Sequence, residues 1–187
     1  MKEHPEIKAQ TKQNLIDAFW QLYCIKRIEK ITVKEITTKA GYNRSTFYEY
    51  FTDVYDILEQ IEKSVLPDLS GHHTFSPEID VMQHFNQFAN IYMERSKYYV
   101  VLLGENGDPA FQGKIKSILT PVLKQFFINN GRVDDFELDY TIEYTISAML
   151  GVLNYGFRRD NNPPIEKLIL LIYSLMSEGV MKKMQKL

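Results

Sequence analysis

The chain has 187 residues, of which 44% are hydrophobic and 25% are charged, and its formal net charge is −2. This composition is typical of a globular protein and excludes a disordered or fibrous chain. Its one cysteine cannot form an internal disulfide, and no apolar run approaches the roughly 18 residues that span a bilayer. Since no signal-peptide core opens the chain, a cytoplasmic protein without membrane contact is expected.

The charge is unevenly distributed along the chain. Residues 1–51 contain nine Lys or Arg and six Asp or Glu, a charge of +3, whereas residues 52–187 contain thirteen and eighteen, a charge of −5. Only charge beside phosphates contributes to counterion release, so an acidic remainder does not exclude nucleic-acid binding by a basic head. The difference is modest and, taken alone, is equally compatible with chance.

The first helices are signalled by periodicity and caps. Apolar residues recur three and four apart over residues 7–25, which predicts an amphipathic helix. Thr32 followed by Glu35 is a capping-box pattern that opens a second helix over residues 33–40. Gly41 ends this helix, because glycine tolerates the left-handed conformation of a C-cap.

Two further helices are predicted before a linker. A third helix is expected from residue 42 or 43 through Phe51, and Thr52 and Asp53 can cap a fourth over residues 53–66. Residues 67–77 contain two prolines, a glycine and two histidines, and are expected to be a linker.

Beyond the linker the pattern is helical throughout. Pro121 is expected to kink or split the helix that contains it. No alternating strand pattern occurs, so an all-α fold of about nine helices is predicted. The later helices are expected over residues 78–103, 111–130, 136–159 and 165–186. The first of these ranges is expected to hold a long helix followed by a shorter one after residue 95.

Three short helices with Gly41 in the turn between the second and the third are the arrangement of a helix-turn-helix. Such a motif places the start of its third helix against base edges in the major groove. Arg44 can donate two hydrogen bonds to guanine and Asn43 can pair with adenine, while the Thr46 and Tyr48 hydroxyls can reach phosphates. These side chains predict double-stranded DNA as a partner.

The segment ITVKEITTKAGYNRSTFYEYF, residues 31–51, resembles the helix-turn-helix of the tetracycline-repressor (TetR) family. The resemblance is good over residues 8–66 and rests beyond them on helix number, length and placement. It implies that Thr46 and Tyr48 contact phosphates and that Asn43, Arg44 and Ser45 face the groove. The matching residues are Thr32, Val33, Ile36, Ala40, Gly41, Thr46, Phe47, Tyr48 and Phe51. The residues expected to contact DNA are Thr32, Tyr42, Asn43, Arg44, Ser45, Thr46 and Tyr48.

Two positions depart from the family pattern. Arg27 stands where many members have a glycine at the end of the first helix, and Val54 stands where many have a lysine at the start of the fourth. Loss of that lysine removes one phosphate contact and predicts weaker, less salt-dependent binding. The segment NRSTFY followed by Asp53 also resembles a subset that includes regulators of sugar-kinase-type operons, whose members need not all be repressors.

The resemblance implies two domains. Residues 1–52 would be the helix-turn-helix DNA-binding domain, linked through helix 53–66, and residues 53–187 a helical effector-binding and dimerisation domain. In the family the last two helices pair with a second subunit as a four-helix bundle, which predicts a palindromic site. The alternative is that these apolar side chains bury against their own domain. The expected interface residues are Ile146, Met149, Leu150, Leu153, Leu168, Leu171, Ile172 and Leu175.

The middle helices are rich in aromatic residues, and in the family this region encloses a small-molecule pocket. An aromatic stripe at helical spacing is also what an ordinary core requires, so both interpretations stay open. The expected pocket residues are Phe85, Phe88, Tyr92, Phe126 and Tyr144.

The sequence therefore predicts a homodimeric, effector-controlled DNA-binding regulator, a repressor by resemblance. No catalytic triad, paired carboxylates or metal motif is present, so neither an enzyme nor a resident cofactor or metal is expected. The alternative is a helical interaction module that has lost DNA binding, or that co-activates, and recruits a protein partner; Val54 and the mild basicity favour it.

Overall fold

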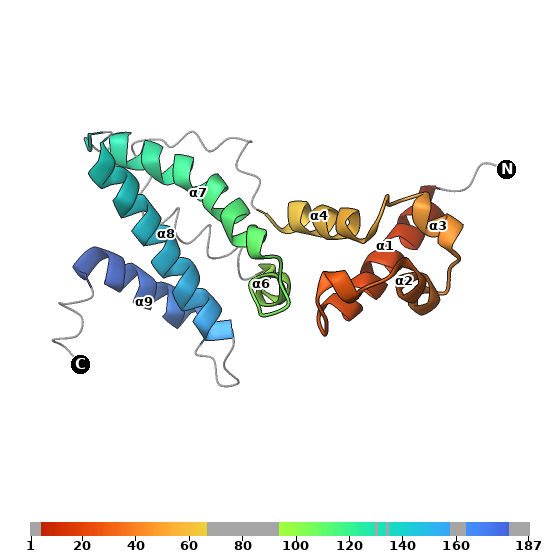
Figure 1. The fold of residues 1–187 in the computed structure, drawn as a ribbon. Coiled ribbons are helices and arrows are strands. Elements are labelled where there is room, and N and C mark those ends of the chain that lie inside the picture. Colours follow the sequence, from red (N-terminus) through yellow and green to blue (C-terminus); the bar gives the residue numbers. More distant parts are fainter. Residues whose placement is uncertain (1–4, 67–93, 130, 134, 158–163, 180–187) are drawn as a thin grey trace. The chain divides into compact units, whose positions relative to one another are not determined.

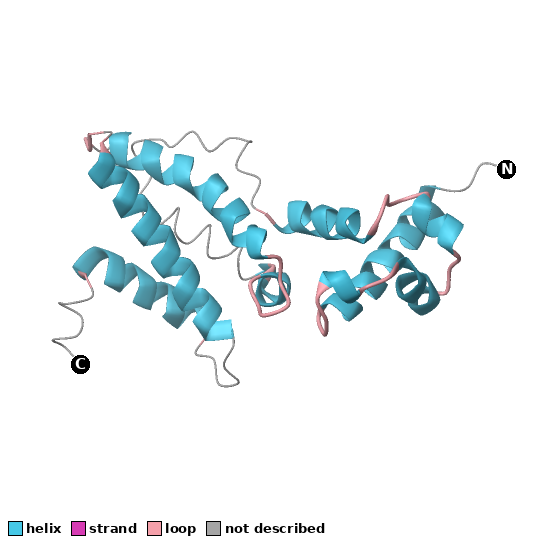
Figure 2. Ribbon diagram, viewed as in Figure 1, coloured by secondary structure: helices cyan, strands magenta, loops and turns pink. Residues whose placement is uncertain are grey.

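The computed structural model describes residues 5–66, 94–129, 131–133, 135–157 and 164–179. Within these ranges every regular element is a helix and no strand occurs (Figure 2). In the described part of the chain, eight elements are α-helices, and η1 (Ile28–Lys30) is a 3-10 helix. The all-α class expected from the sequence is confirmed.

The chain divides into two compact units. The first contains Met1–Leu66 together with Glu105–Asp108, and the second contains Pro67–Gly104 and Pro109–Leu187. The first unit therefore includes the helix over residues 54–65, which the sequence analysis assigned to the second domain as a link. Its α-helices are α1 (Pro5–Tyr23), α2 (Val33–Ala40), α3 (Arg44–Tyr48) and α4 (Val54–Val65) (Figure 1).

Helix α1 supplies the centre of the first unit's core. Leu15, Ala18, Phe19 and Tyr23 are buried, and their spacing of three, one and four residues forms a single stripe along the helix. Helix α1 packs with this stripe against α2 and α4. The other helices of the unit and the turn before α4 complete the core with Ile36, Phe47, Phe51, Ile57, Leu58 and Ile61.

Helix α2 has the ends that the sequence predicts. The Thr32 side chain accepts from the Glu35 amide, and the Glu35 carboxylate accepts from the Thr32 amide, which completes the capping box. Gly41 adopts φ 78°, its amide donates to Thr38 O, and the next amide donates to Thr37 O over 2.9 Å. This pair of bonds is a Schellman motif, which requires the left-handed backbone that glycine adopts without strain.

Helix α3 is shorter than expected, because it ends at Tyr48 rather than Phe51. The amides of Tyr50 and Phe51 both donate to Phe47 O in the tight turn that follows. Phe47 is completely buried and Phe51 is 2% exposed, and their ring centroids lie 5.5 Å apart. The chain turns after Tyr48 so that Phe51 joins Phe47 in the core.

The second unit is built from longer helices. Helix α7 packs along α8, and α8 packs against α9 (Figure 1). An ion pair and hydrogen bond join Lys116 to Glu143, Lys116 also donates to Ser147 over 2.8 Å, and Lys124 pairs with Asp139 over 2.9 Å. These polar contacts fix the register of α7 on α8. The α-helices of this unit are α6 (Ser96–Leu102), α7 (Pro109–Asn129), α8 (Phe136–Phe157) and α9 (Ile165–Glu178).

One helix prediction for this unit is narrowed and another is corrected. Pro121 lies inside α7, which is not split there, so of the two expected effects only a kink stays a prediction. Helix α9 ends at Glu178 rather than at residue 186, because the next residue, Gly179, has a φ of 80° and so a backbone that is not helical. Residues 180–187 lie outside the described part of the chain.

The two glycines Gly41 and Gly113 provide a matched stability test. Gly41→Ala should lower the free energy of unfolding by about 1 kcal/mol, because alanine is strained at positive φ. Gly113→Ala should raise it by about 0.5–1 kcal/mol, because Gly113 lies inside α7 and nothing stands within 4 Å of the added Cβ. Urea unfolding monitored by circular dichroism measures both, and equal effects would contradict the assigned backbone conformations.

Candidate nucleic-acid interface

Helix α3 turns its polar side chains outward. Arg44 and Ser45 are exposed, and Tyr48 is 58% exposed with its ring set edge-on against Phe47 at 5.4 Å between centroids. The buried Phe47 anchors the helix from the opposite side. Arg44 and Tyr48 therefore stand on a supported surface from which a guanidinium and a phenol can reach a ligand.

Asn43 is used as a helix cap rather than left free. Its Oδ1 accepts from the Thr46 amide at 2.9 Å, from Thr46 Oγ1 at 3.0 Å and from Ser45 Oγ at 2.6 Å. A bidentate contact with adenine needs the same oxygen as an acceptor. The adenine contact expected from the sequence would require Asn43 to leave all three partners.

The start of α2 is closed by an acidic side chain. Thr32 Oγ1 donates to Glu35 at 2.9 Å, and Lys26 Nζ pairs with the same carboxylate at 2.6 Å. The hydrogen bond from Lys26, with those from Thr32, holds the pKa of Glu35 below its usual range, so Glu35 carries its negative charge at neutral pH. Thr32 therefore has its hydroxyl hydrogen engaged and a carboxylate beside it.

The start of α4 is closed in the same way. Asp53 accepts from the Tyr55 amide at 2.8 Å and the Asp56 amide at 2.9 Å, and Asp56 accepts from the Thr52 amide at 2.8 Å. Hydrogen bonds from Gln60 and then Thr52 hold the pKa of Asp56 below its usual range. An uncapped helix start would attract phosphate. Here the Asp53 and Asp56 carboxylates occupy the amides, and Val54 follows Asp53 in the chain.

Tyr42 differs from the other hydroxyl residues of the motif. Its hydroxyl oxygen accepts from Asn14 Nδ2 at 2.9 Å, so this bond leaves its hydrogen free to donate. Phosphate oxygens only accept, and the hydrogens of Thr32, Ser45 and Thr46 are already given to Glu35 and Asn43. Of the seven residues expected to contact DNA, Arg44, Tyr42 and Tyr48 retain a donor suited to phosphate or a base edge without breaking a cap. Asn43 also keeps its Nδ2 donor, because its cap uses only Oδ1.

Two buried polar side chains inside this unit were not predicted from the sequence. Glu62 of α4 is 1% exposed and Tyr23 of α1 is completely buried. Burial, and then the Glu62 charge, raise the pKa of the Tyr23 hydroxyl well above its usual range. The position of Glu62 four residues after Leu58 and three before Val65, on the apolar face of α4, is the signal from which its burial could have been predicted.

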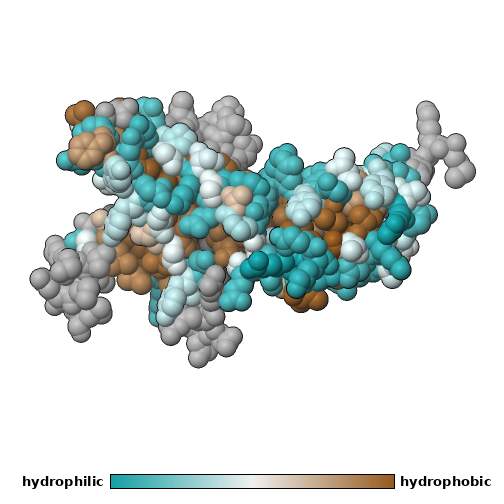
Figure 3. All heavy atoms as spheres, in the orientation of Figure 1, coloured by the Kyte–Doolittle hydropathy of each residue, from teal (hydrophilic) through white to brown (hydrophobic). Residues whose placement is uncertain are grey.

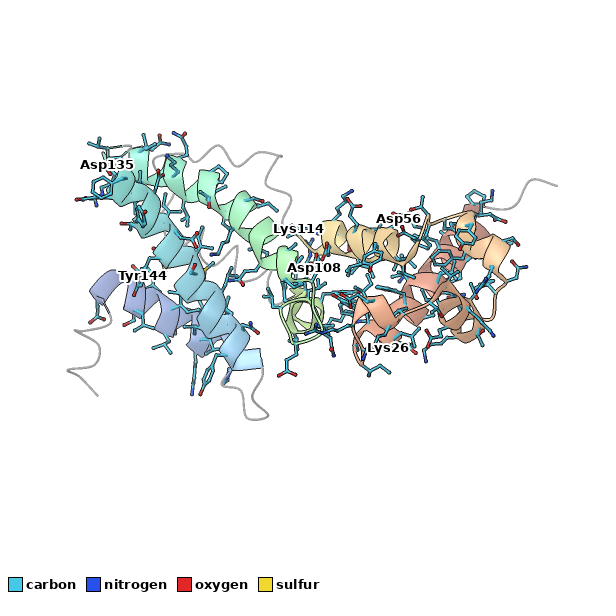
Figure 4. The ribbon with its side chains drawn as sticks, in the orientation of Figure 1. Lys26, Asp56, Asp108, Lys114, Asp135 and Tyr144 are labelled. Atoms are coloured by element: carbon cyan, nitrogen blue, oxygen red, sulfur yellow. The ribbon has the colours of Figure 1, made fainter. Side chains whose placement is uncertain are left out.

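The expected effector-pocket residues are not brought together by the described part of the chain. Phe85, Phe88 and Tyr92 lie outside the described residues, and Phe126 lies in α7 with a side chain that the structure does not describe. Tyr144 is 64% exposed on α8 (Figure 4). In the structure Tyr144 is thus on the surface of its unit rather than in an enclosed site.

Most of the expected dimer-interface residues are buried within their own unit. Leu171 is 39% exposed and Leu175 is half-buried. The alternative interpretation, that such residues fill their own core, accounts for Ile146, Met149, Leu150, Leu153, Leu168 and Ile172, all of which are buried.

A different face of α8 is left at the surface. Tyr140, Tyr144 and Tyr155 are 74%, 64% and 63% exposed, and Ala148 and Gly151 lie exposed between them. Their spacing of four, four, three and four residues places all five on one face, which we call the tyrosine stripe. Exposed Leu170, Leu171 and Met176 of α9 add apolar surface, and hydrophobic residues come to the surface over α8 and α9 in Figure 3.

Other kinds of site find no support among the described residues. No group of three or more His, Cys, Asp or Glu side chains in the described ranges could hold a metal ion. None of the helices described is both long and apolar enough to cross a membrane.

Solved structures with the same fold are named as transcription regulators. The dihydroxyacetone kinase operon activator DhaS matches with TM-score 0.60 and 19% identity over 91% of this chain and 96% of that one. A TetR transcriptional regulator from Streptococcus agalactiae matches with TM-score 0.65 and 18% identity over 91% and 96%. The fatty acid degradation regulator FadR from Bacillus halodurans matches with TM-score 0.61 and 16% identity over 96% and 98%. At these identities the likeness establishes the fold.

The family follows from the second unit. No curated protein sequence matches the chain significantly. Residues 80–178, just over half of the chain, match a TetR family model described as the transcriptional regulator C-terminal region. This match agrees with the helix-turn-helix signature at the other end of the chain and with the fold of the solved regulators. The chain belongs to the TetR family of transcriptional regulators.

Proposed function

We propose that this regulator binds a palindromic operator as a homodimer and represses transcription until a small-molecule effector binds its second unit. The observation that carries the proposal is the exposed face of α3, where Arg44 and Tyr48 project from a helix anchored by the buried Phe47. A guanidinium matches the two acceptors of guanine, and a phenol hydroxyl matches a phosphate oxygen. The proposal assigns the chain no catalytic activity.

Selection of binding sites from a random duplex library tests the operator directly. The full-length protein should enrich a palindrome, because two copies related by a two-fold axis present two identical helices to DNA. Enrichment of a single half-site without symmetry would contradict the dimeric mode of binding, and no enrichment at any salt concentration would contradict sequence-specific binding.

The tyrosine stripe of α8 supports dimerisation. Three exposed tyrosines with alanine and glycine between them allow the helix of a second copy to approach closely, and nothing lies within 4 Å of the position of a Cβ on Gly151. Tyrosine is enriched at protein interfaces because its ring is large and its hydroxyl can still bond. The expected contact between subunits is therefore formed by this face rather than by the residues buried beneath it.

Effector control is proposed for the second unit because that unit matches the C-terminal region of transcriptional regulators, the region to which the family resemblance assigns a small-molecule pocket. An effector changes operator affinity only by binding the DNA-competent and incompetent states differently. Repression requires only that the dimer occupy its operator, whereas the similar protein DhaS is named as an operon activator. Transcription from an operator-linked reporter, with the regulator present or deleted, decides the sign.

A second candidate function is a helical interaction module that recruits a protein partner. The closed starts of α2 and α4 favour it, since Glu35, Asp53 and Asp56 place carboxylates where many DNA-binding heads offer amides or lysines. Such a module would show weak binding to all duplexes and no enriched site in the selection.

Arg44→Ala should cost about 1–3 kcal/mol on the selected operator and relax the preference at one base pair, if Arg44 reads guanine. Arg44→Lys is the matched control, because it keeps the charge but loses the two-pronged geometry. Titration of operator variants by fluorescence anisotropy measures both. An equal loss on every sequence would instead identify Arg44 as a phosphate contact.

Tyr48→Phe should weaken binding to all sequences equally.

Val54→Lys should strengthen operator binding and steepen its salt dependence. Each added phosphate contact changes the slope of log K against log salt by about −0.9. Val54→Met, similar in length and without charge, serves as the control and should leave the slope unchanged. An unchanged slope in Val54→Lys would show that the acidic start of α4, with Asp53 and Asp56, stays away from DNA.

Tyr144→Arg should weaken self-association by about 1,000-fold, because a central aromatic anchor is worth about 2 kcal/mol and occurs twice in a two-fold interface. Val133→Arg changes another exposed apolar residue of the same unit away from the stripe and should leave the dimer intact. Sedimentation equilibrium gives both dissociation constants. A dimer unaffected by Tyr144→Arg would exclude the tyrosine stripe as the interface.

A further inference from the structure

Tyr42 lies in a turn whose backbone is fixed on both sides. Before it, Gly41 closes the Schellman motif, in which the Tyr42 amide itself donates to Thr37 O over 2.9 Å. After it, Asn43 caps α3 by accepting from the Thr46 amide over 2.9 Å. Because these hydrogen bonds fix the backbone on both sides of Tyr42, rotation about its side-chain torsions is the freedom that remains.

A residue of another helix fixes the side chain of Tyr42. Asn14 of α1, 28 residues away in sequence, donates from Nδ2 to the Tyr42 hydroxyl over 2.9 Å. Asn14 is oriented in turn, because its Oδ1 accepts from Gln10 Nε2 over 2.9 Å. Asn14 is the donor in this bond and Tyr42 is the acceptor, so the bond leaves the phenolic hydrogen of Tyr42 unused. Within the described residues no acceptor for that hydrogen is found.

We propose that Asn14 is a positioning residue for DNA binding: it holds the Tyr42 hydroxyl as a fixed donor to a backbone phosphate next to the start of α3. The inference rests on the proposed DNA-binding function. A hydroxyl that accepts one hydrogen bond becomes a better donor through the other. Its side chain is also ordered before binding, so less rotamer entropy is lost when the phosphate arrives.

Few other groups around Tyr42 are free to donate to this phosphate. The hydroxyl hydrogens of Thr32, Ser45 and Thr46 are used inside the protein, and carboxylates close the starts of α2 and α4. A pre-oriented phenol at the turn supplies a phosphate donor that these elements do not. Without Asn14 the phenol would keep its place in the chain and lose its fixed direction.

A purely structural role predicts a different outcome. If the Asn14–Tyr42 bond only ties α1 to the turn, its loss lowers the free energy of unfolding and leaves the folded protein's affinity for DNA unchanged. If Asn14 positions a phosphate donor, its loss lowers affinity in a way that depends on the Tyr42 hydroxyl. A double-mutant cycle separates the two.

The cycle compares four full-length proteins: wild type, Asn14→Ala, Tyr42→Phe and the double variant. Their affinity for the selected operator is measured under conditions in which urea unfolding shows that each protein is folded. Tyr42→Phe should weaken binding by about tenfold, the value of one hydrogen bond to a charged group. Asn14→Ala should weaken binding several-fold alone and cause no further loss when Phe replaces Tyr42. The control Gln13→Ala, whose side chain bonds to Asp17 on the same helix, should bind as wild type does.

Asn14→Asp reverses the direction of the bond and sharpens the test. The introduced carboxylate accepts the phenolic hydrogen, so α1 stays tied to the turn while the donor to phosphate is lost. Its cost should exceed the cost of the same substitution in the Tyr42→Phe background, where only the added negative charge acts.

The outcomes separate the two levels of the proposal. A wild-type protein that enriches no duplex overturns the DNA-binding function and this inference with it. A wild-type protein that binds its operator, with Asn14→Ala binding equally well or losing the same factor with and without the Tyr42 hydroxyl, overturns the role of Asn14 alone.

Discussion

The doubly capped turn between α2 and α3 is the constraint on which the helix-turn-helix, the proposed DNA-binding part of the chain, depends. Gly41 at φ 78° closes α2, and Asn43 opens α3 two residues later, so the angle between the two helices is set by backbone and side-chain hydrogen bonds that each join residues at most five apart. The buried Phe47 then fixes which face of α3 points outward. The exposed positions of Arg44 and Tyr48 follow from these local restraints together with one core contact.

The same capping that rigidifies the head also uses up much of its polar surface. Asn43 gives its oxygen to three donors, and Glu35, Asp53 and Asp56 occupy the amides at the starts of α2 and α4. The backbone amides at these helix starts are thus hydrogen-bonded within the protein, so fewer donors remain that could bind phosphates. In the proposed function, a helix-turn-helix built this way would bind DNA through a small set of fixed side-chain donors rather than through helix dipoles and lysines.

In the second unit, polar contacts to α7 and exposed tyrosines lie on different sides of α8. Lys116 and Lys124 of α7 pair with Glu143 and Asp139, which aligns the two helices. The apolar residues between them fill the core, and the tyrosine stripe stays outside. Six of the eight expected interface residues are buried within their own unit, while Leu171 is exposed and Leu175 is half-buried, because apolar character predicts burial but not which neighbour provides it.

The sequence alone determined the all-helical class, the capping box at Thr32, the C-cap at Gly41 and the inward side of α3, because periodicity and caps act within a few residues. It also carried the family signature in residues 31–51. Only the tertiary structure decided that Asn14 bonds Tyr42 across 28 residues, that the Glu62 charge acts on the buried Tyr23 hydroxyl, and that Tyr144 faces outward. Each of these depends on how two helices pack, and side-chain spacing within one helix holds no information about its partner.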